Sequence, residues 1–322
     1  MNKRTFFSMV AVCFLLIFLP SMLSAQWPGI PKGWSDGYVF ANGIRIHYYH
    51  AVPNPGKPVI VMAHGVSDNG LCWTTLTQNL QKDYDIYMVD ARGHGLTDPP
   101  TPADSSNAAI KDLVEFVGKM QFVNPILMGH SMGAGTVMRV GADYPTLAKA
   151  IVLLDPGLRA RTSATTVSAP VANPVPTTAI PAKPTSGVKK LTVSMGGSPE
   201  VLVAQNNFSY EDLYAIGRRQ NPLWGDLDVQ YWALSKKQYH GNYGGGAARR
   251  VPSNADNPLE KIQVPTIILK ADASPEVRKA NEDAARVMIK GKLVHIDGAG
   301  HNLHHDKLER TTQVIKEFLS SL

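Results

Sequence analysis

A serine between two glycines is the residue whose setting points most directly to chemistry. The stretch "NPILMGHSMGAGTVMRV" (124–140) runs from apolar residues into Gly-His-Ser-Met-Gly and then into small helix-forming residues. In a strand–turn–helix of this kind the turn is so tight that side chains at Gly129 and Gly133 would collide with neighbouring backbone. The hydroxyl of Ser131 is then held at the edge of a sheet, in front of a helix N-terminus. We therefore interpret Ser131 as a nucleophile.

A serine hydroxyl needs a base near neutral pH, and a histidine near the end of the chain can supply it. His301 follows a predicted strand and a glycine turn in "DGAGHNLHHD" (297–306). With His304 and His305 it forms H-x-x-H-H, a spacing that suggests a metal site, but no cysteine or acidic cluster completes a zinc set. We expect no metal and no cofactor. We expect His304 and His305 to begin the last helix and to be partly solvated.

Two aspartates at predicted strand ends could hold the other nitrogen of the His301 imidazole. Asp272 ends "PTIILKAD" (265–272), and Asp155 ends "AKAIVLLD" (148–155). Both lie beside the serine if the strand order follows the chain order in this half. We favour Asp272 and keep Asp155 as the alternative. The aspartate that is not used is expected to cap the turn that follows it.

Backbone N–H groups could stabilise an oxyanion that develops next to Ser131. Met132 opens the helix after the serine, and Val66 follows the predicted strand "KPVIVMAHG" (57–65), so we expect their amides to act together. We expect His64, at the end of that strand, to brace the loop. A further polar set is expected to lock the next loop by hydrogen bonds rather than to react: Asp90, Arg92 and His94.

The elements that position these residues alternate between short apolar strands and helices. Two strands are expected in 37–52, joined at Asn42-Gly43. Further strands are expected within 57–65, 84–95, 124–130, 148–155, 265–272 and 292–298, and helices within 73–82, 107–120 and 307–322. Buried strands alternating with helices imply an α/β fold with a mostly parallel sheet covered on both faces.

The alternation breaks once, between the strand that ends at 155 and the strand that begins at 265. The stretch 163–187 contains five prolines and no aromatic residue, so it has little to bury and is expected to be extended or mobile. Two helical stretches follow it, at 210–220 and 227–240. We divide the chain into a core formed by 26–157 and 258–322, and an intervening region, 158–257, with a flexible proline-rich segment and a helical cap.

The first 25 residues are expected to form a secretory signal peptide. Lys3 and Arg4 precede the apolar run "MVAVCFLLIFLP", and Ala25 offers a cleavage site. The alternative is an uncleaved membrane anchor. Cleavage would lower the net charge from +6 to +4 and leave Cys72 as the one cysteine, so no internal disulfide could form. We expect a periplasmic or secreted protein with no nucleic-acid partner and no stable membrane insertion after cleavage.

These motifs together resemble the α/β-hydrolase fold superfamily. The resemblance is carried by "HG" at 64–65, "DARGHG" at 90–95, "GHSMGAG" at 129–135 and "GAGH" at 298–301. It implies an eight-stranded, mostly parallel sheet with a cap inserted after the sixth strand. It also implies acyl-enzyme chemistry, in which Ser131 attacks a carbonyl, His301 moves the proton and water releases the acid.

The chain departs from the family pattern at one place. Members often carry Gly-x-x-Asp after the seventh strand, and that count falls on Ser274 here. Some relatives place the acid after the sixth strand, which keeps Asp155 open. Haloalkane dehalogenases and epoxide hydrolases of this fold use an aspartate as nucleophile, and this chain has Ser131 there.

The leading hypothesis is an exported serine hydrolase that cleaves an ester, thioester or lactone of a small, largely apolar substrate. The same residues could serve C–C bond or amide hydrolysis, or cofactor-free perhydrolysis. A non-catalytic binding protein of the same fold is the alternative from another class. Four aromatic residues of the cap either line an apolar pocket or form the core of the cap: Trp224, Tyr231, Trp232 and Tyr243.

Overall fold

The computed structural model describes residues 27–158, 193, 199–241 and 257–322. The predicted signal peptide (1–25), the proline-rich stretch (163–187) and Tyr243 lie outside the described residues. Within the described ranges, no helix combines the length and the apolar character needed to cross a membrane.

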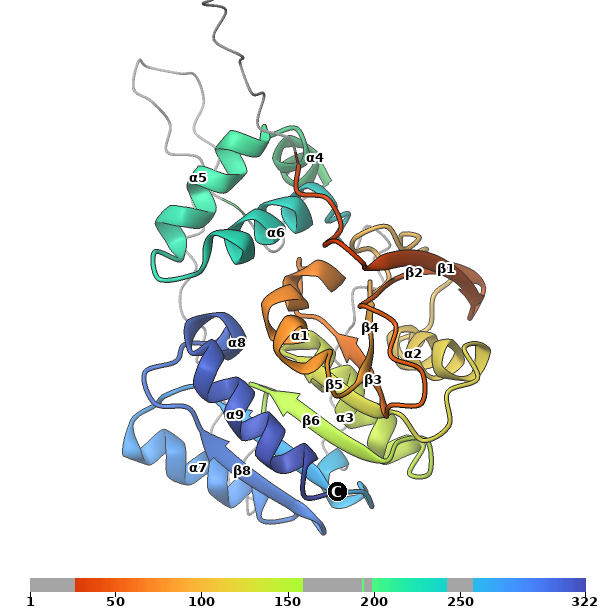
Figure 1. Ribbon diagram of the computed structural model, residues 1–322, viewed down its shortest axis with the longest axis vertical. Helices are drawn as coiled ribbons and strands as arrows, with labels where there is room; N and C mark the ends of the chain where they lie inside the picture. The colour runs from red at the N-terminus through yellow and green to blue at the C-terminus, as the bar shows by residue number, and fades with distance from the viewer. Residues whose placement is uncertain (1–26, 159–192, 194–198, 242–256) are drawn as a thin grey trace, which may run out of the picture.

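A sheet of eight strands forms the centre of the described molecule (Figure 1). Its order is β1-β2-β4-β3-β5-β6-β7-β8, and every pairing from β4 to β8 is parallel. The strands are β1 (Ser35–Ala41), β2 (Ile44–His50), β3 (Val59–Ala63), β4 (Asp85–Val89), β5 (Ile126–His130), β6 (Ala150–Leu154), β7 (Thr266–Lys270) and β8 (Gly291–His295). The predicted mostly parallel eight-stranded sheet, opened by a hairpin at Asn42-Gly43, is confirmed.

The central strands are rich in apolar residues because both of their faces are covered. Every residue of β5 and β6 is buried, as expected of parallel strands between two helical layers. The register pairs His130 with Leu154 and Leu154 with Leu269. Strands β5, β6 and β7 therefore end at nearly the same level, and the residues that follow them share one edge of the sheet.

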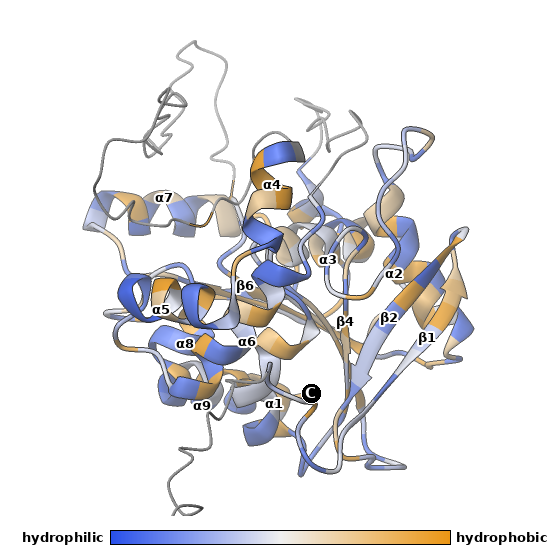
Figure 2. Ribbon diagram, turned by 90° about the horizontal axis from the view of Figure 1, so that it is seen from above, coloured by the Kyte–Doolittle hydropathy of each residue, from blue (hydrophilic) through white to orange (hydrophobic). Residues whose placement is uncertain are grey.

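Two layers of helices enclose the sheet. Apolar side chains of α1 (Thr74–Leu80) and α9 (Leu308–Leu319) pack on one face. Those of α2 (Ala108–Lys119), α3 (Met132–Asp143) and α7 (Pro275–Ala285) pack on the other. Hydrophilic and hydrophobic residues alternate along α7, as expected of a helix with one buried side (Figure 2). Short helices complete the core: η1 (Gly70–Trp73), η2 (Pro258–Glu260) and α8 (Leu303–Asp306).

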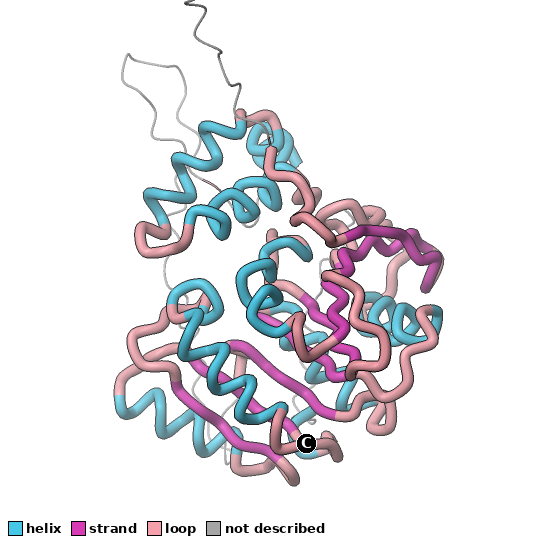
Figure 3. The backbone as a smooth tube through the Cα atoms, in the orientation of Figure 1, coloured by secondary structure: helices cyan, strands magenta, loops and turns pink. Residues whose placement is uncertain are grey.

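The cap follows β6 and precedes β7 in sequence, as predicted. Its described part contains helices and loops (Figure 3): α4 (Pro199–Asn206), α5 (Tyr210–Gln220) and α6 (Asp226–Lys237). The sequence patterns did not predict α4. Trp224 and Trp232 form a small apolar core within the cap. Tyr231 packs into the main core instead, and its hydroxyl donates to the carbonyl of Gly29 at 2.9 Å. These three aromatic residues are packing residues.

Candidate active site

The turn between β5 and α3 holds Ser131 in a strained conformation. Its φ is +50° and its ψ is −111°, a region that residues other than glycine seldom occupy. The Ser131 N–H donates to the carbonyl of Leu154 at 2.9 Å, which ties the turn to the neighbouring strand. A Cβ at Gly129 would meet the backbone of Gly133, and a Cβ at Gly133 would meet the backbone of Ala63. The turn therefore requires both glycines, because a side chain at either position would collide with backbone, as the sequence predicted.

The imidazole of His301 lies between the serine and an aspartate. Its Nε2 is 2.8 Å from the Oγ of Ser131, and its Nδ1 is 2.5 Å from Oδ2 of Asp155. This geometry lets Nδ1–H donate to the carboxylate while Nε2 accepts from the serine hydroxyl. The sequence prediction brought Ser131 and His301 together, and the structure brings them within hydrogen-bond distance.

The carboxylate of Asp155 is largely buried, and its side chain is 12% exposed. Burial would raise the pKa of Asp155, but the hydrogen bond from His301 and the ammonium of Lys270 more than offset it and lower the pKa to about 2. Lys270 Nζ lies 2.5 Å from Oδ1, and the Ala271 N–H donates to the same oxygen at 3.2 Å. The carboxylate is therefore ionised and can stabilise an imidazolium.

The structure corrects our preference for Asp272. Its side chain is 41% exposed and pairs with Arg278 at 2.5 Å, which lowers the pKa of Asp272. Its other oxygen accepts the Gly298 N–H at 2.8 Å. Asp272 therefore fastens the turn that leads to His301 but does not contact its imidazole. Ser274, where the family pattern would place an acid, caps the start of α7.

The two amides expected to face an oxyanion lie at the predicted places. Met132 is the first residue of α3, and Val66 lies in the loop after β3. In the described part of the chain, neither amide donates a hydrogen bond to another residue. The Gly133 N–H donates to the carbonyl of His64 at 3.1 Å, which joins the loop to the first turn of α3. Among the described residues both amides are therefore available as donors, and the bond from Gly133 to His64 joins the two segments that carry them.

His64 has the geometry of the bracing residue that we expected. Its Nδ1 donates to the carbonyl of Gly65 at 2.7 Å, and its Nε2 accepts the Ala91 N–H at 3.0 Å. Burial lowers the pKa of His64 and so favours the neutral ring that this pattern requires. The side chain links the loops after β3 and β4 to each other.

The set Asp90, Arg92 and His94 forms a hydrogen-bonded lock, as expected. Asp90 accepts the N–H groups of Gly70 and Leu96 at 2.6 and 3.0 Å. Arg92 pairs with Asp112 at 2.7 Å. The Nδ1 of His94 lies 2.9 Å from the carbonyl of Arg92, and burial lowers the pKa of His94 to about 3. The sequence reading missed His47, whose Nδ1 lies 2.7 Å from Asp90. Its signal was its place in β2, directly after the buried Ile46.

The expectation that His304 and His305 are partly solvated is wrong, because cap and core residues cover them. They are 2% and 8% exposed. Aromatic rings enclose them: Trp73 lies 4.7 Å from His304, and Trp224 of the cap lies 4.3 Å from His305. Burial lowers the pKa of His304 well below its usual value. Asp228 of α6 lies 3.1 Å from Nδ1 of His305, so the cap closes over α8.

His130 is a site residue that the sequence reading missed. It precedes the serine, is 2% exposed, and its Nε2 lies 3.0 Å from the carbonyl of His301. Burial lowers the pKa of His130 to about 4, so the neutral ring can donate this hydrogen bond. A histidine at the end of a wholly buried strand could have signalled it. It couples the nucleophile turn to the histidine loop.

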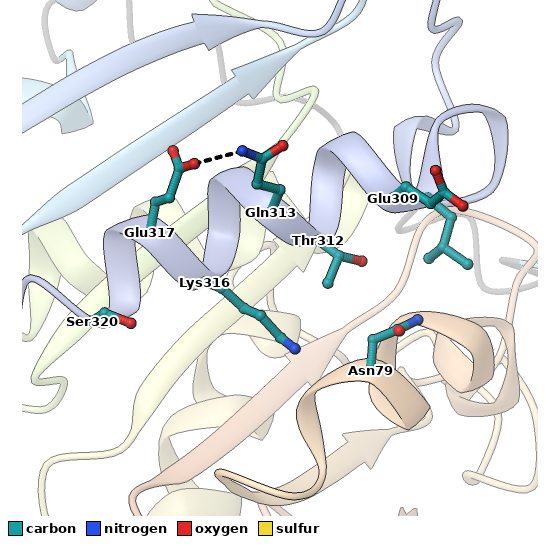
Figure 4. A pocket seen from close by; sticks show the side chains of 8 residues that line it. Asn79, Glu309, Thr312, Gln313, Lys316, Glu317 and Ser320 are labelled. Carbon is teal, nitrogen blue, oxygen red and sulfur yellow. Dashed lines mark hydrogen bonds between the residues drawn. The ribbon is translucent and has the colours of Figure 1, made fainter.

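Two hollows lie outside the Ser131–His301–Asp155 contact. A surface pocket of about 740 Å³ lies between α1 and α9, where mostly polar side chains line it (Figure 4). A small apolar cavity of about 50 Å³ touches Met132, Gly133 and Thr136 in the first turns of α3. Among the described residues, no group of three or more His, Cys, Asp or Glu side chains could hold a metal ion.

The family comparison agrees with the fold. A family model described as "Alpha/beta hydrolase family" matches residues 60–315, which include the cap and most of both halves of the core. The chain therefore belongs to the alpha/beta hydrolase family.

Individual relatives are distant. Epoxide hydrolase 1 of Caenorhabditis elegans is 22% identical over 324 residues, which cover 91% of this chain and 72% of the relative. N-formylmaleamate deformylase of Pseudomonas putida is 31% identical, over 38% of this chain and 45% of the relative. Among solved structures, E-2-(acetamidomethylene)succinate hydrolase is 17% identical with a TM-score of 0.64, covering 89% of this chain and 99% of that one. That likeness supports the fold.

Proposed function

We propose that this chain is a serine hydrolase that works through an acyl-enzyme on Ser131. The observation that carries the proposal is the single hydrogen-bonded line from the serine hydroxyl through His301 to the ionised carboxylate of Asp155. A base oriented by a buried carboxylate and placed next to a strained serine is the arrangement that nucleophilic catalysis requires. Ser131, His301 and Asp155 are therefore the proposed catalytic triad.

The geometry accounts for each step of the reaction. The Oγ of Ser131 attacks the carbonyl carbon while His301 Nε2 accepts the hydroxyl proton. Asp155 holds Nδ1–H and stabilises the positive ring. The amides of Val66 and Met132 donate to the oxyanion. His301 then returns the proton to the leaving group, and a water molecule, deprotonated by the same imidazole, releases the acid from Ser131.

We favour an ester, thioester or lactone of a small, largely apolar molecule as the substrate. Amide cleavage is the second candidate, because two relatives are named for substrates that carry an acylated nitrogen: the deformylase described above and 2-(acetamidomethylene)succinate hydrolase of Mesorhizobium japonicum. Epoxide opening is disfavoured, because epoxide hydrolases of this fold use an aspartate where this chain has Ser131.

We also propose that the protein is exported, on the strength of residues 1–25 alone. The basic start, apolar run and Ala25 support cleavage before Gln26. N-terminal sequencing of the protein recovered from the cell envelope or medium tests this. A mature chain that still begins at Met1 would contradict cleavage.

A fluorophosphonate probe tests the catalytic proposal, because it labels an activated serine covalently. We expect labelling of the wild type and none of Ser131→Ala, with Ser105→Ala as the control, since Ser105 is exposed on a loop outside the site. A panel of p-nitrophenyl esters, thioesters, lactones and anilides should lose all turnover in Ser131→Ala and rank the bond types. A folded wild type that takes no label would favour the non-catalytic binding protein.

A further inference from the structure

A buried ammonium joins the cap to the loop after β3. Lys236, near the end of α6, is 2% exposed. Its Nζ donates to the carbonyl of Ser67 at 2.8 Å, to the Oγ of Ser67 at 3.0 Å and to Oδ1 of Asp68 at 2.8 Å. An ammonium has three N–H donors. All three are therefore used on two consecutive residues of one loop.

Because all three N–H donors of Lys236 are used, the ammonium has a structural role in the loop. Burying a lysine is unfavourable unless the ammonium is paired and hydrogen-bonded, and here it is both. The ring of Trp232 lies 5.0 Å from Nζ and contributes a cation–π contact. No donor remains for a substrate carboxylate. The role of Lys236 therefore lies in the loop and not in direct substrate binding.

The loop that Lys236 holds is strained and contains the proposed oxyanion donor. Ser67 has a φ of +61° and is 1% exposed. Such a conformation persists where surrounding contacts enforce it. Val66, whose amide is the proposed donor, is the residue directly before Ser67. A second cap contact holds the same loop, because Asn69 Nδ2 donates to Oε1 of Gln238 at 2.8 Å.

We propose that Lys236 is a positioning residue for catalysis, and that it fixes the Val66 amide in the oxyanion hole from the cap. This inference rests on the proposed serine-hydrolase function. It makes α6 a part of the active site rather than only a cover, because a donor misplaced by a fraction of an ångström loses much of its effect on the transition state. The cap then contributes to kcat as well as to substrate binding.

The test compares Lys236→Met with Lys237→Met in p-nitrophenyl acetate hydrolysis. Lys237 is its neighbour on α6, and its Nζ donates to Asn206 within the cap. We expect Lys236→Met to lower kcat by about 10- to 100-fold, below the full loss of an oxyanion donor, with KM changed less than about 2-fold. Lys237→Met should keep the wild-type kcat.

Inhibition by a trifluoromethyl ketone separates positioning from a general loss of fold. Its adduct with Ser131 carries an oxyanion, so its affinity should fall by the same factor as kcat/KM in Lys236→Met. If that variant fails to fold, Gln238→Ala provides a second test, because it removes the contact with Asn69 of the same loop without creating a buried cavity. We expect it to lower kcat by about 2- to 5-fold. Unchanged kcat in the folded variants, or a change in KM alone, would overturn the inference.

The Ser131 variant keeps the two failures apart. If Ser131→Ala retains turnover, the proposed function fails, whatever Lys236 does. If Ser131 is essential and labels normally while the Lys236 and Gln238 variants keep their kcat, the function stands and the positioning role fails.

Discussion

The ends of β6 and β7 carry the same kind of residue in two different settings. Asp155 follows β6 directly and is level with the end of β7, since its N–H donates to the carbonyl of Leu269. Asp272 lies two residues beyond β7 and points to the turn before His301. Their side chains are 12% and 41% exposed. The carboxylate one residue beyond its strand reaches the imidazole, and the carboxylate two residues beyond its strand reaches the Gly298 amide instead.

The neighbouring cations reinforce this difference. Lys270 is the last residue of β7. Its ammonium pairs with Asp155, which follows the adjacent strand β6, and not with Asp272, which follows β7 itself. Arg278 of α7 pairs with Asp272 and also with Asp297, at 2.6 Å. The first pair is enclosed and lowers the pKa of the carboxylate in the proposed triad. The second is solvated and fastens a surface turn, where ion pairs contribute little to stability.

The strongest way to break this comparison is to exchange one carboxylate for an amide. Asp155→Asn should lower kcat by about 10⁴-fold, because the imidazole loses the partner that fixes its tautomer and stabilises its positive charge. Turnover of p-nitrophenyl acetate measures the effect. Asp272→Asn is the matched control and should keep kcat and the thermal midpoint close to wild type. If Asp272→Asn loses kcat and Asp155→Asn keeps it, the triad acid is Asp272 and our assignment is wrong.

Lowering the pH should destabilise the protein through buried groups at this edge of the sheet and not through exposed ones. His130, at the end of β5, has a pKa lowered from 6.5 to about 4 by burial. Between these values the unfolded chain binds a proton that the folded chain does not, so stability falls as the pH drops from about 6.5 to about 4. The expected slope is about 1.4 kcal/mol per pH unit for each histidine of this kind.

Urea unfolding at several pH values measures that slope. His94 and His304 add to it because burial also lowers their pKa values, whereas His47 partly offsets it, since Asp90 and Asp36 raise its pKa despite burial. His130→Asn should flatten the slope. Asp272→Asn should leave it unchanged, because Arg278 keeps the pKa of Asp272 below this range. A stability that stays flat from pH 6.5 to 4.5 in the wild type would contradict the neutral buried histidines.

Within this comparison of the two strand ends, the smallest effect is expected from Lys270, which pairs with Asp155 and not with Asp272. Lys270→Met removes the ammonium from Asp155 and the hydrogen bond to the carbonyl of Pro156. The pKa of Asp155 should rise and kcat should fall by about 10-fold, equivalent to about 1.4 kcal/mol. Lys279→Met removes an exposed pair with Asp283 on α7 and is the matched control. If both variants have the same kcat, Lys270 does not support the acid.

The sequence by itself determined the features that depend on neighbours along the chain. The apolar strands, the hairpin at Asn42-Gly43 and the tight turn around Ser131 are local, because steric limits on a few consecutive residues decide them. His301 could be predicted as the base because a glycine turn sets it beyond the last strand. The motif order was enough to indicate the family resemblance that the comparisons then confirmed.

Only the tertiary structure decided between residues of the same type at equivalent positions. The choice of Asp155 over Asp272 depends on strand register and on where Lys270 and Arg278 lie, and no local pattern records those distances. The burial of His304 depends on aromatic rings from other segments, and the contact of Lys236 with Ser67 spans 169 positions. Such contacts form between segments far apart in the chain, so only the packed fold determines them.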